Sequence, residues 1–511
     1  MKEEPGNNYS GIVIFLLALF NAALHLYVSD NLEYHRDELL YLSLGLHPAA
    51  GYATVAPMTG WIAGIMQGIF GTSVFAVRLF PALMSAVMVY LVAAIARETG
   101  GTGYARILAA AGFVFSIAGS RTFLFLSPLH TDVFFWTLIF YLIVKYINTS
   151  SGKYLLFLGI SAGAALLNNY FSGLLILSVL LVLPFTRHRN IFSQRQFRIG
   201  MLAGFLIFLP NLVWQIVNGF PALNHPGELE QIRPVNTDRA AFLAEQLIIT
   251  GMASILTLAG LIHLFTSRYA WQYRFPGTVS LVVILLLMIF RGKTFNALGV
   301  YPFLMAAGAV LWDMTLRKTW SKLILLLLIV ILSIPSLPIG IPLAGPEKLA
   351  SYFEVLKRDY KMDFVCGFEN GSVRALPRDY SDMIGWEELT KLAAQAWENI
   401  EDKNAAFIFC ENYGCAGAVT IIGKKYGLPE AVSFQENLRY RIPLIFKPDI
   451  SSVVYIDDEV DEDIHRIFGK LTKVGSVSNP LSSEYGTSVW LLEEPLANFN
   501  YFWIERVKQF F

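Results

Sequence analysis

The chain has 511 residues, of which 55% are hydrophobic and 15% are charged, against about 25% charged residues in typical soluble domains. This composition excludes an ordinary soluble globular protein and predicts a polytopic membrane protein. The 39 basic and 39 acidic residues cancel, and without a basic tail or patch there is no reason to expect a nucleic-acid partner.

Long apolar runs recur over the first two thirds of the chain, each bounded by charged or Gly/Pro-rich turns. A helix needs about 20 apolar residues to cross a bilayer, and no alternating β-barrel pattern is visible. We therefore expect eleven spanning helices, the first an uncleaved anchor rather than a signal peptide. Their expected ranges are 11–29, 74–96, 105–126, 132–147, 154–168, 172–186, 199–217, 241–266, 275–290, 299–316 and 321–341.

Basic residues are distributed unequally between the two sides of these spans. Thirteen Lys and Arg residues flank the connections on the N-terminal side, and seven flank those on the other side. Cytoplasmic loops carry the excess of basic residues, so we predict a multi-pass protein of the inner (plasma) membrane with a cytoplasmic N-terminus. An odd number of spans then puts everything after Leu343 on the outer, extracytoplasmic side.

The composition changes abruptly after the last apolar run, where Asp, Glu and Lys become frequent. This change divides the chain into a transmembrane domain, 1–344, and an extracytoplasmic soluble α/β domain, 345–511, which is long enough for its own core. The expected elements of the second domain are strands at 405–410 and 452–456 and helices at 386–399 and 417–426. Cys410 and Cys415 fit either a disulfide or free thiols.

The pair Asp37-Glu38 follows the first apolar run. A charge at the bilayer centre costs roughly 2.5–3.5 kcal/mol, so we expect this pair at the membrane–water boundary. A polar loop that merely solvates a helix end would explain it, and so would a pair of site carboxylates.

Other polar residues on the outer side also allow two interpretations. Tyr52 fits an interfacial anchor, Asp132 a helix N-cap, and Lys293 a snorkelling lysine. His225 lies in the polar segment 218–239, which fits a solvated loop or a lid. No metal-ligand spacing or nucleotide-binding loop occurs, so the sequence predicts neither a metal nor a cofactor.

A set of short motifs occurs in a fixed order along the chain. They are Asp37-Glu38, Gly51-Tyr52 with Pro57, Phe70-Gly71, Arg78-Leu79, Thr131-Asp132, Gly292-Lys293, Tyr301-Pro302, Asp382 to Glu388, Asn412-Tyr413-Gly414 and Ala416-Gly417-Ala418. Taken together, these motifs resemble those of the bacterial protein O-mannosyltransferase-like glycosyltransferases (glycosyltransferase family 39, GT-C class). The resemblance covers nearly the whole chain, including the tail.

The resemblance implies an integral-membrane glycosyltransferase that moves a sugar from a polyprenyl-phosphate carrier to a lipid, glycan or protein acceptor on the outer face. It implies Asp37 as general base, with Glu38 beside it and Asp132 as the second acidic residue of the site. Tyr41 would help near the donor phosphate, and Lys293 would contact the carrier phosphate. The further substrate-binding candidates are Tyr52, His225, Arg291 and Tyr301. The partners implied are the lipid-linked donor and membrane lipids.

The chain also departs from the family's pattern. Asn168-Asn169-Tyr170 stands where relatives often have Lys before Tyr, Ala56-Pro57 where they often have paired prolines, and Phe295-Asn296 where they usually have an aromatic pair. The rival interpretation is a transporter or flippase of lipid-linked sugars, which would show intramembrane charges and internal repeats. A third interpretation is a catalytically inactive scaffold whose tail binds partners, but it gives the Asp-Glu pair no function.

Overall fold

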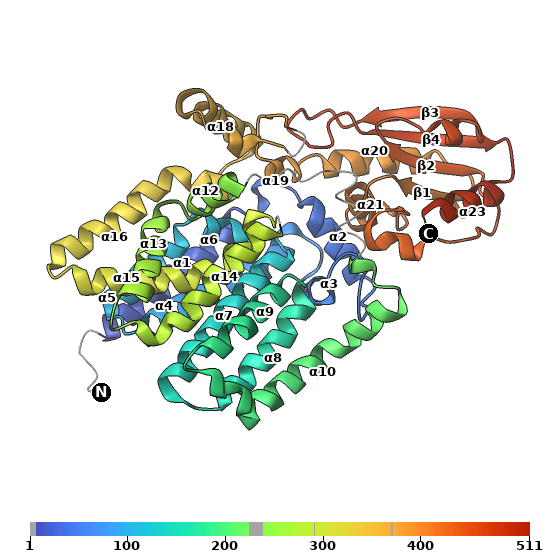
Figure 1. The fold of residues 1–511 in the computed structure, drawn as a ribbon. Coiled ribbons are helices and arrows are strands. Elements are labelled where there is room, and N and C mark those ends of the chain that lie inside the picture. The colour runs from blue at the N-terminus through green and yellow to red at the C-terminus, as the bar shows by residue number, and fades with distance from the viewer. Residues whose placement is uncertain (1–6, 224–238, 291, 369–370, 511) are drawn as a thin grey trace. The chain divides into compact units, whose positions relative to one another are not determined.

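The computed structural model describes residues 7–223, 239–290, 292–368 and 371–510 (Figure 1). The chain forms two compact units that cross the predicted boundary. The helical unit comprises Met1–Ser29, Val55–Thr59 and Arg78–Leu343, and the sheet unit comprises Asp30–Thr54, Gly60–Val77 and Ala344–Phe511. The segment that contains the Asp-Glu pair therefore belongs to the same compact unit as the tail.

The helical unit is built from apolar helices. They are α1 (Asn7–Tyr27), α4 (Val74–Glu98), α5 (Gly103–Val114), α6 (Ile117–Thr122), α7 (Pro128–Thr149), α8 (Lys153–Asn168), α9 (Ser172–Val182), α10 (Arg195–Val217), α12 (Arg239–Thr250), α13 (Ser254–Thr266), α14 (Arg274–Ile289), α15 (Tyr301–Thr315), α16 (Thr319–Ser333) and α17 (Leu337–Gly340). Their outward side chains are large and apolar, as Leu323, Leu327 and Ile331 of α16 illustrate. A helix with this surface is suited to lipid.

Among the described residues, eight helical stretches are long and apolar enough to cross a membrane, and three apolar helices are shorter. The eight are Tyr9–Asn31, Val74–Glu98, Pro128–Thr149, Arg195–Val217, Arg239–Thr266, Trp271–Ile289, Thr294–Thr315 and Thr319–Gly340; the shorter ones are Gly103–Val114, Lys153–Asn168 and Ser172–Phe185. Together they cover the positions of the eleven expected spans, which confirms the polytopic helical class.

The expected span 105–126 is wrong as a single helix. Helix α5 ends at Val114, and the Ser116 side chain accepts the N–H of Gly119 at 2.9 Å to cap the new helix α6. A serine in this position satisfies one of the backbone donors that a helix start leaves open. The chain therefore turns here.

Helices α8 and α10 cross at four glycines. A Cβ atom at Gly163 would lie 2.2 Å from the Gly204 carbonyl oxygen, and one at Gly159 would lie 2.1 Å from the Gly200 carbonyl carbon. The glycines are spaced four residues apart on each helix, so they form one stripe on each. Close backbone approach of this kind holds helices together in lipid.

The sheet unit combines two short N-terminal helices with the tail. Its elements are α2 (Arg36–Gly45), α3 (Pro57–Phe70), α18 (Pro346–Tyr360), α19 (Arg378–Ser381), α20 (Trp386–Glu398), β1 (Ala406–Cys410), α21 (Tyr413–Ile421), β2 (Ser452–Asp457), α22 (Glu462–His465), β3 (Phe468–Ser476), β4 (Ser488–Pro495) and α23 (Phe499–Phe510). The strand order is β1-β2-β4-β3, with β1 and β2 parallel and the other neighbours antiparallel (Figure 1).

Both faces of this sheet are covered by helices. Alternate residues of β1 and β2, such as Phe407, Phe409 and Tyr455, pack in one apolar cluster with Trp503 of α23. Helix α20 contacts β2, β3 and β4, and the intervening residues Ile408 and Val454 are fully buried. The period-2 alternation of strand side chains explains this division. The expected strands at 405–410 and 452–456 and the helix at 386–399 are confirmed.

The expected helix at 417–426 is misplaced. Helix α21 begins at Tyr413, because the Asn412 side chain accepts the N–H of Cys415 at 2.8 Å and caps it. Cys366, Cys410 and Cys415 are buried free thiols in this structure.

Candidate functional site

The Asp-Glu pair forms the first turn of α2. His35 is the N-cap, and its Nδ1 accepts the N–H of Asp37 at 3.1 Å. Glu38, three residues after the cap, accepts the N–H of His35 at 2.9 Å through its Oε2. This reciprocal capping box satisfies two backbone donors.

The capping contact leaves the two neighbouring carboxylates with different exposure to solvent. Glu38 is 0% exposed, and its oxygen is engaged with the backbone of His35. The Asp37 side chain is 39% exposed, so solvent and small molecules reach it. Exposure therefore distinguishes the Asp37 carboxylate from that of Glu38.

The Asp37 carboxylate has one hydrogen-bond partner from the tail. The Tyr413 hydroxyl donates to Oδ1 at 2.8 Å. His35 Nδ1 lies 3.9 Å from Oδ2, but that nitrogen already accepts a backbone N–H and carries no proton in this geometry. Among the residues that the structure describes, none donates a hydrogen bond to Oδ2, so this oxygen remains able to accept a proton.

Tyr41 lies one helical turn after Asp37 on α2 and is buried. Burial, together with the charge of Asp37 and Glu436, holds the pKa of Tyr41 well above its ordinary value. The phenol therefore stays neutral and remains a hydrogen-bond donor.

Tyr52 closes the turn that follows α2. Its hydroxyl donates to the Leu44 carbonyl at 3.1 Å and accepts the N–H of Ala49 at 3.3 Å. The side chain is buried, and a Cβ on Gly60 would lie 2.8 Å from its ring. These contacts give Tyr52 a structural function that requires no substrate.

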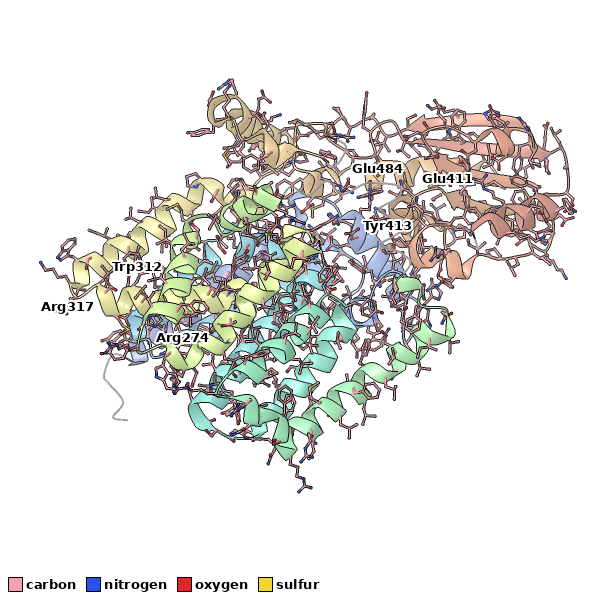
Figure 2. All side chains as sticks on the ribbon, in the orientation of Figure 1. Arg274, Trp312, Arg317, Glu411, Tyr413 and Glu484 are labelled. Atoms are coloured by element: carbon pink, nitrogen blue, oxygen red, sulfur yellow. The ribbon has the colours of Figure 1, made fainter. Side chains whose placement is uncertain are left out.

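Arg36 connects the Asp-Glu turn to the tail. Its guanidinium pairs with Glu484 and lies 3.6 Å from Asp382. Its backbone N–H donates to the Asp382 carbonyl at 3.1 Å. Burial opposes the charge, but these two carboxylates raise the pKa of Arg36. Figure 2 labels Tyr413 and Glu484, two of the tail residues that contact this turn.

In the helical unit, Asp132 is buried near the start of α7. It is not the N-cap, because Ser127 holds that position and His130 completes a capping box. Asp132 Oδ1 instead accepts from Ser172 at 2.5 Å and from the Trp136 indole at 3.1 Å. The simple capping interpretation is thus wrong.

Residues 168–170, where the chain departs from the family's pattern, connect the end of α8 to the neighbouring helices. The Asn168 side chain donates to the Pro128 carbonyl at 2.8 Å. The Tyr170 hydroxyl donates to the Asn211 side chain at 3.1 Å and accepts from Gln215 at 3.1 Å. Asn168 therefore connects α8 to α7, and Tyr170, which the family's pattern shares, makes the contact to α10.

Lys293 and Tyr301 also belong to the helical unit. The exposed Lys293 ammonium lies 5.9 Å from the centroid of the Phe295 ring. Tyr301 is buried, and its hydroxyl donates to Gln246 of α12, which connects α12 to α15. Arg291 and His225 lie outside the described residues.

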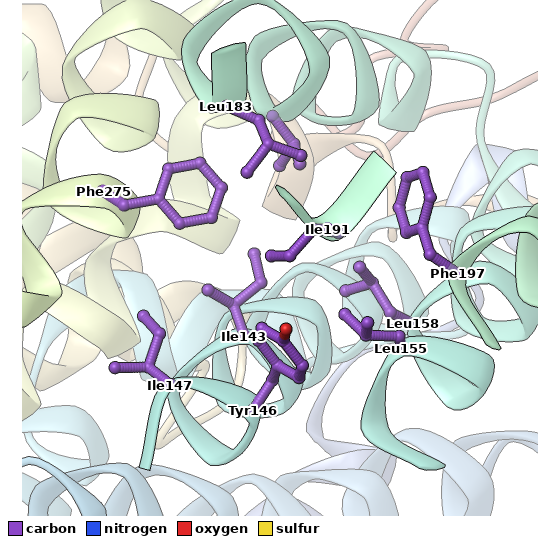
Figure 3. A pocket seen from close by; sticks show the side chains of 10 residues that line it. Ile143, Tyr146, Ile147, Leu155, Leu158, Leu183, Ile191, Phe197 and Phe275 are labelled. Carbon is purple, nitrogen blue, oxygen red and sulfur yellow. The ribbon is translucent and has the colours of Figure 1, made fainter. Parts of the chain in front are cut away.

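Among the described residues, no cluster of three or more His, Cys, Asp or Glu side chains has the arrangement of a metal site. One cavity of the helical unit has a volume of about 10 Å³ and an apolar lining that includes Ile143, Leu158 and Phe275 (Figure 3). This volume corresponds to about one water molecule, so the cavity is a packing defect rather than a ligand site.

Sequence reasoning found Asp37 and Glu38 but assigned no role to Arg36, Tyr413 or Glu484. Arg36 was visible only as a loop charge. Tyr413 belongs to the motif Asn412-Tyr413-Gly414, whose function the sequence does not show. Glu484 had no local signal, because its partner Arg36 is 448 residues away.

Residues 54–214 match the family model described as dolichyl-phosphate-mannose-protein mannosyltransferase. The fold is similar to that of ArnT from Cupriavidus metallidurans in its apo state, with 13% sequence identity and a TM-score of 0.65 over 95% of this chain and 98% of that one. It is likewise similar to ArnT in its undecaprenyl phosphate complex, with 13% identity and a TM-score of 0.62 over 93% of this chain and 97% of that one. It is also similar to the oligosaccharyltransferase AglB from Archaeoglobus fulgidus, with 13% identity and a TM-score of 0.51 over 88% of this chain and 69% of that one. The search of curated proteins found no matching relative.

The family match and the fold confirm the resemblance to GT-C-type, polyprenyl-phosphate-dependent glycosyltransferases that the motifs indicated. They support a membrane glycosyltransferase that uses a lipid-linked donor. Nothing among them favours the transporter or the scaffold.

Proposed function

We propose that this protein transfers a sugar from a polyprenyl-phosphate-linked donor to an acceptor hydroxyl or phosphate on the outer face of the inner membrane, with Asp37 as general base. The observation that carries the proposal is the Asp37 carboxylate, which a capped helix fixes in place and which stays open to solvent. The family match over residues 54–214 and the GT-C fold supply the reaction class.

In this reaction the acceptor oxygen forms a bond to the anomeric carbon while the bond from that carbon to the phosphate oxygen breaks. The leaving polyprenyl phosphate takes the electron pair of the broken bond. The acceptor proton goes to Asp37 Oδ2, the oxygen to which no described residue donates, and later to solvent. A base within hydrogen-bond reach accelerates such a step by roughly two to four orders of magnitude.

Three further roles complete the proposal. Lys293 contacts the carrier phosphate, because a compact ammonium stabilises the charge that the departing phosphate gains. Asp132 is the second carboxylate of the reaction. Glu38 acts through the backbone, because its capping contact to His35 orients the turn that carries Asp37.

The experiment that tests the function is a transfer assay with the purified full chain in lipid nanodiscs. Undecaprenyl-phosphate- and dolichyl-phosphate-linked sugars, mannose included, are offered with a cell-envelope extract as acceptor, and release of polyprenyl phosphate is measured. We expect release with at least one donor, and release that is slower by roughly two to four orders of magnitude from the Asp37→Asn variant. Release from no donor, or equal release from both proteins, would overturn the proposal.

A further inference from the structure

We propose that Tyr413 of the C-terminal helix α21 is a positioning residue for the Asp37 carboxylate, an inference that rests on the proposed transfer reaction. The carboxyl-terminal part of the chain would then contribute a group to catalysis, and the sheet unit would be more than an attached domain. Four observations within the sheet unit carry the inference.

The first is the direction of the hydrogen bond. A carboxylate only accepts, so the Tyr413 hydroxyl must be the donor across the 2.8 Å contact to Oδ1. This contact fixes rotation of the Asp37 side chain and leaves Oδ2 to receive the acceptor proton. Burial, together with the Asp37 charge, raises the pKa of Tyr413 well above its ordinary value, which keeps the donor proton in place.

The second is the way Tyr413 is held. It is the first residue of α21, directly after the N-cap Asn412. The Asn412 side chain accepts the N–H of Cys415 and donates to Glu484 at 3.0 Å, and Glu484 is the buried partner of Arg36. One continuous set of polar contacts therefore connects the start of α21 to the start of α2.

The third is the close packing of the two helices. A Cβ on Gly417 would lie 2.8 Å from the Leu39 Cβ, and one on Gly414 would lie 2.8 Å from the Arg36 Cγ. Only glycine allows α21 to approach α2 so closely at these positions. The approach brings the Tyr413 hydroxyl within reach of a carboxylate on the facing helix.

The fourth is that the capping of α2 does not require the Tyr413 contact. Asp37 is exposed on one side and has no other hydrogen-bond donor to its side chain among the described residues. The hydrogen bond that Tyr413 donates joins residues 376 positions apart in the sequence, and it is not needed for the capping of α2, which His35 and Glu38 already provide. Orientation of the carboxylate is the function left for it.

A double-mutant cycle between Tyr413→Phe and Asp37→Asn tests this inference in the full-length protein. Phenylalanine keeps the ring and removes only the donor. We expect kcat to fall roughly 10- to 100-fold, the range for a lost hydrogen bond to a charged group, with KM for the donor unchanged. If Tyr413 acts through Asp37, Tyr413→Phe should have no further effect on the residual rate of Asp37→Asn.

The matched control is Tyr455→Phe. Tyr455 of β2 also donates to a carboxylate of the sheet unit, Glu411, at 2.9 Å, and its ring stacks on Phe409 of β1. We expect its kcat to equal that of the parent. An equal loss in both tyrosine variants, an additive effect in the Asp37→Asn background, or parental kcat in Tyr413→Phe would overturn the inference.

The outcomes separate the two proposals. If Asp37→Asn is inactive and Tyr413→Phe behaves like the parent, the transfer reaction stands and the positioning role fails. If Asp37→Asn retains parental activity, the proposed function fails. Should Tyr413→Phe yield little folded protein, 3-fluorotyrosine at position 413 keeps the shape and strengthens the donor, and an unchanged kcat in that variant would also overturn the inference.

Discussion

Arg36 and Glu484 form an ion pair inside the sheet unit, although 448 residues separate them along the chain. Both side chains are largely buried, at 15% and 4% exposure. Removing one partner of such a pair leaves a charge with too little compensation. The contact therefore makes the Asp-Glu turn depend on the tail.

This dependence gives the first prediction. Glu484→Ala should destabilise the protein by about 3–5 kcal/mol at most, the range for a broken buried pair, and less where Asp382 compensates Arg36. The control is Glu493→Ala, which breaks the exposed pair with Lys470 and should cost about 0–1 kcal/mol. Thermal unfolding in detergent measures both. Equal stabilities of the two variants would show that the Arg36 pair is not an anchor.

The second prediction distinguishes the adjacent carboxylates. Asp37→Asn should lower kcat by roughly two to four orders of magnitude without a change in unfolding temperature. Glu38→Gln should keep most of the activity, because a glutamine side chain also completes a capping box. Donor turnover is the measurement. If Glu38→Gln proves the more damaging substitution, Glu38 is the base and the roles assigned here are reversed.

The third prediction concerns Asp132. Asp132→Asn should reduce kcat by at least about two orders of magnitude if the carboxylate takes part in the reaction. Ser172→Ala removes one of its donors and should cost about 1 kcal/mol of stability with a small effect on rate. Turnover and unfolding temperature are compared for both variants. A parallel loss of stability and rate in the two would assign Asp132 to packing alone.

The fourth prediction concerns the carrier phosphate. Lys293→Ala should raise KM for the lipid-linked donor and lower kcat, since charge on the phosphate grows in the transition state. Lys293→Arg should recover part of the loss, because it keeps the charge but not the compact ammonium. Donor titrations of the three proteins measure this. If Lys293 only snorkels to the interface, all three curves will coincide.

The fifth prediction concerns topology. Single cysteines at Ser193 and Glu401, both exposed, should react with an impermeant thiol reagent from opposite sides of the membrane. The native cysteines are buried and serve as the background control. The expectation follows from the basic residues of the connecting loops. Labelling of both positions from one side would contradict the outer-face reaction.

The sequence predicted the elements whose residues form an unbroken local pattern. Most of the apolar helices, β1, β2 and α20 have continuous apolar runs or a helical period, so their positions agree with the structure; the expected span 105–126, which the structure divides into α5 and α6, is the exception. Strands β3 and β4 were both missed. Strand β4 contains the short apolar run Val489 to Leu492, which was not recognised as a strand. Strand β3 is largely exposed or half-buried and carries polar residues such as Lys470 and Thr472. A strand of that composition gives no apolar alternation to detect.

The site was predictable only in part, for a different physical reason. The acidic pair was visible because charges stand out beside an apolar run. The capping box was not, since histidine is an unusual N-cap residue. The contacts to Tyr413 and Glu484 form between chain segments several hundred residues apart in the sequence. A local sequence pattern does not show which distant segments come into contact.

The glycine stripes of α8 and α10 affect how an alignment of related sequences should be read. A methyl group at Gly159, Gly163 or Gly204 would enter the backbone of the neighbouring helix, so selection should keep these positions as strictly as a nucleophile. If alignment positions were ranked by invariance, these glycines would rank as high as Asp37 and could be taken for catalytic residues. In this protein, invariance at a polar residue and invariance at a glycine should be given separate explanations.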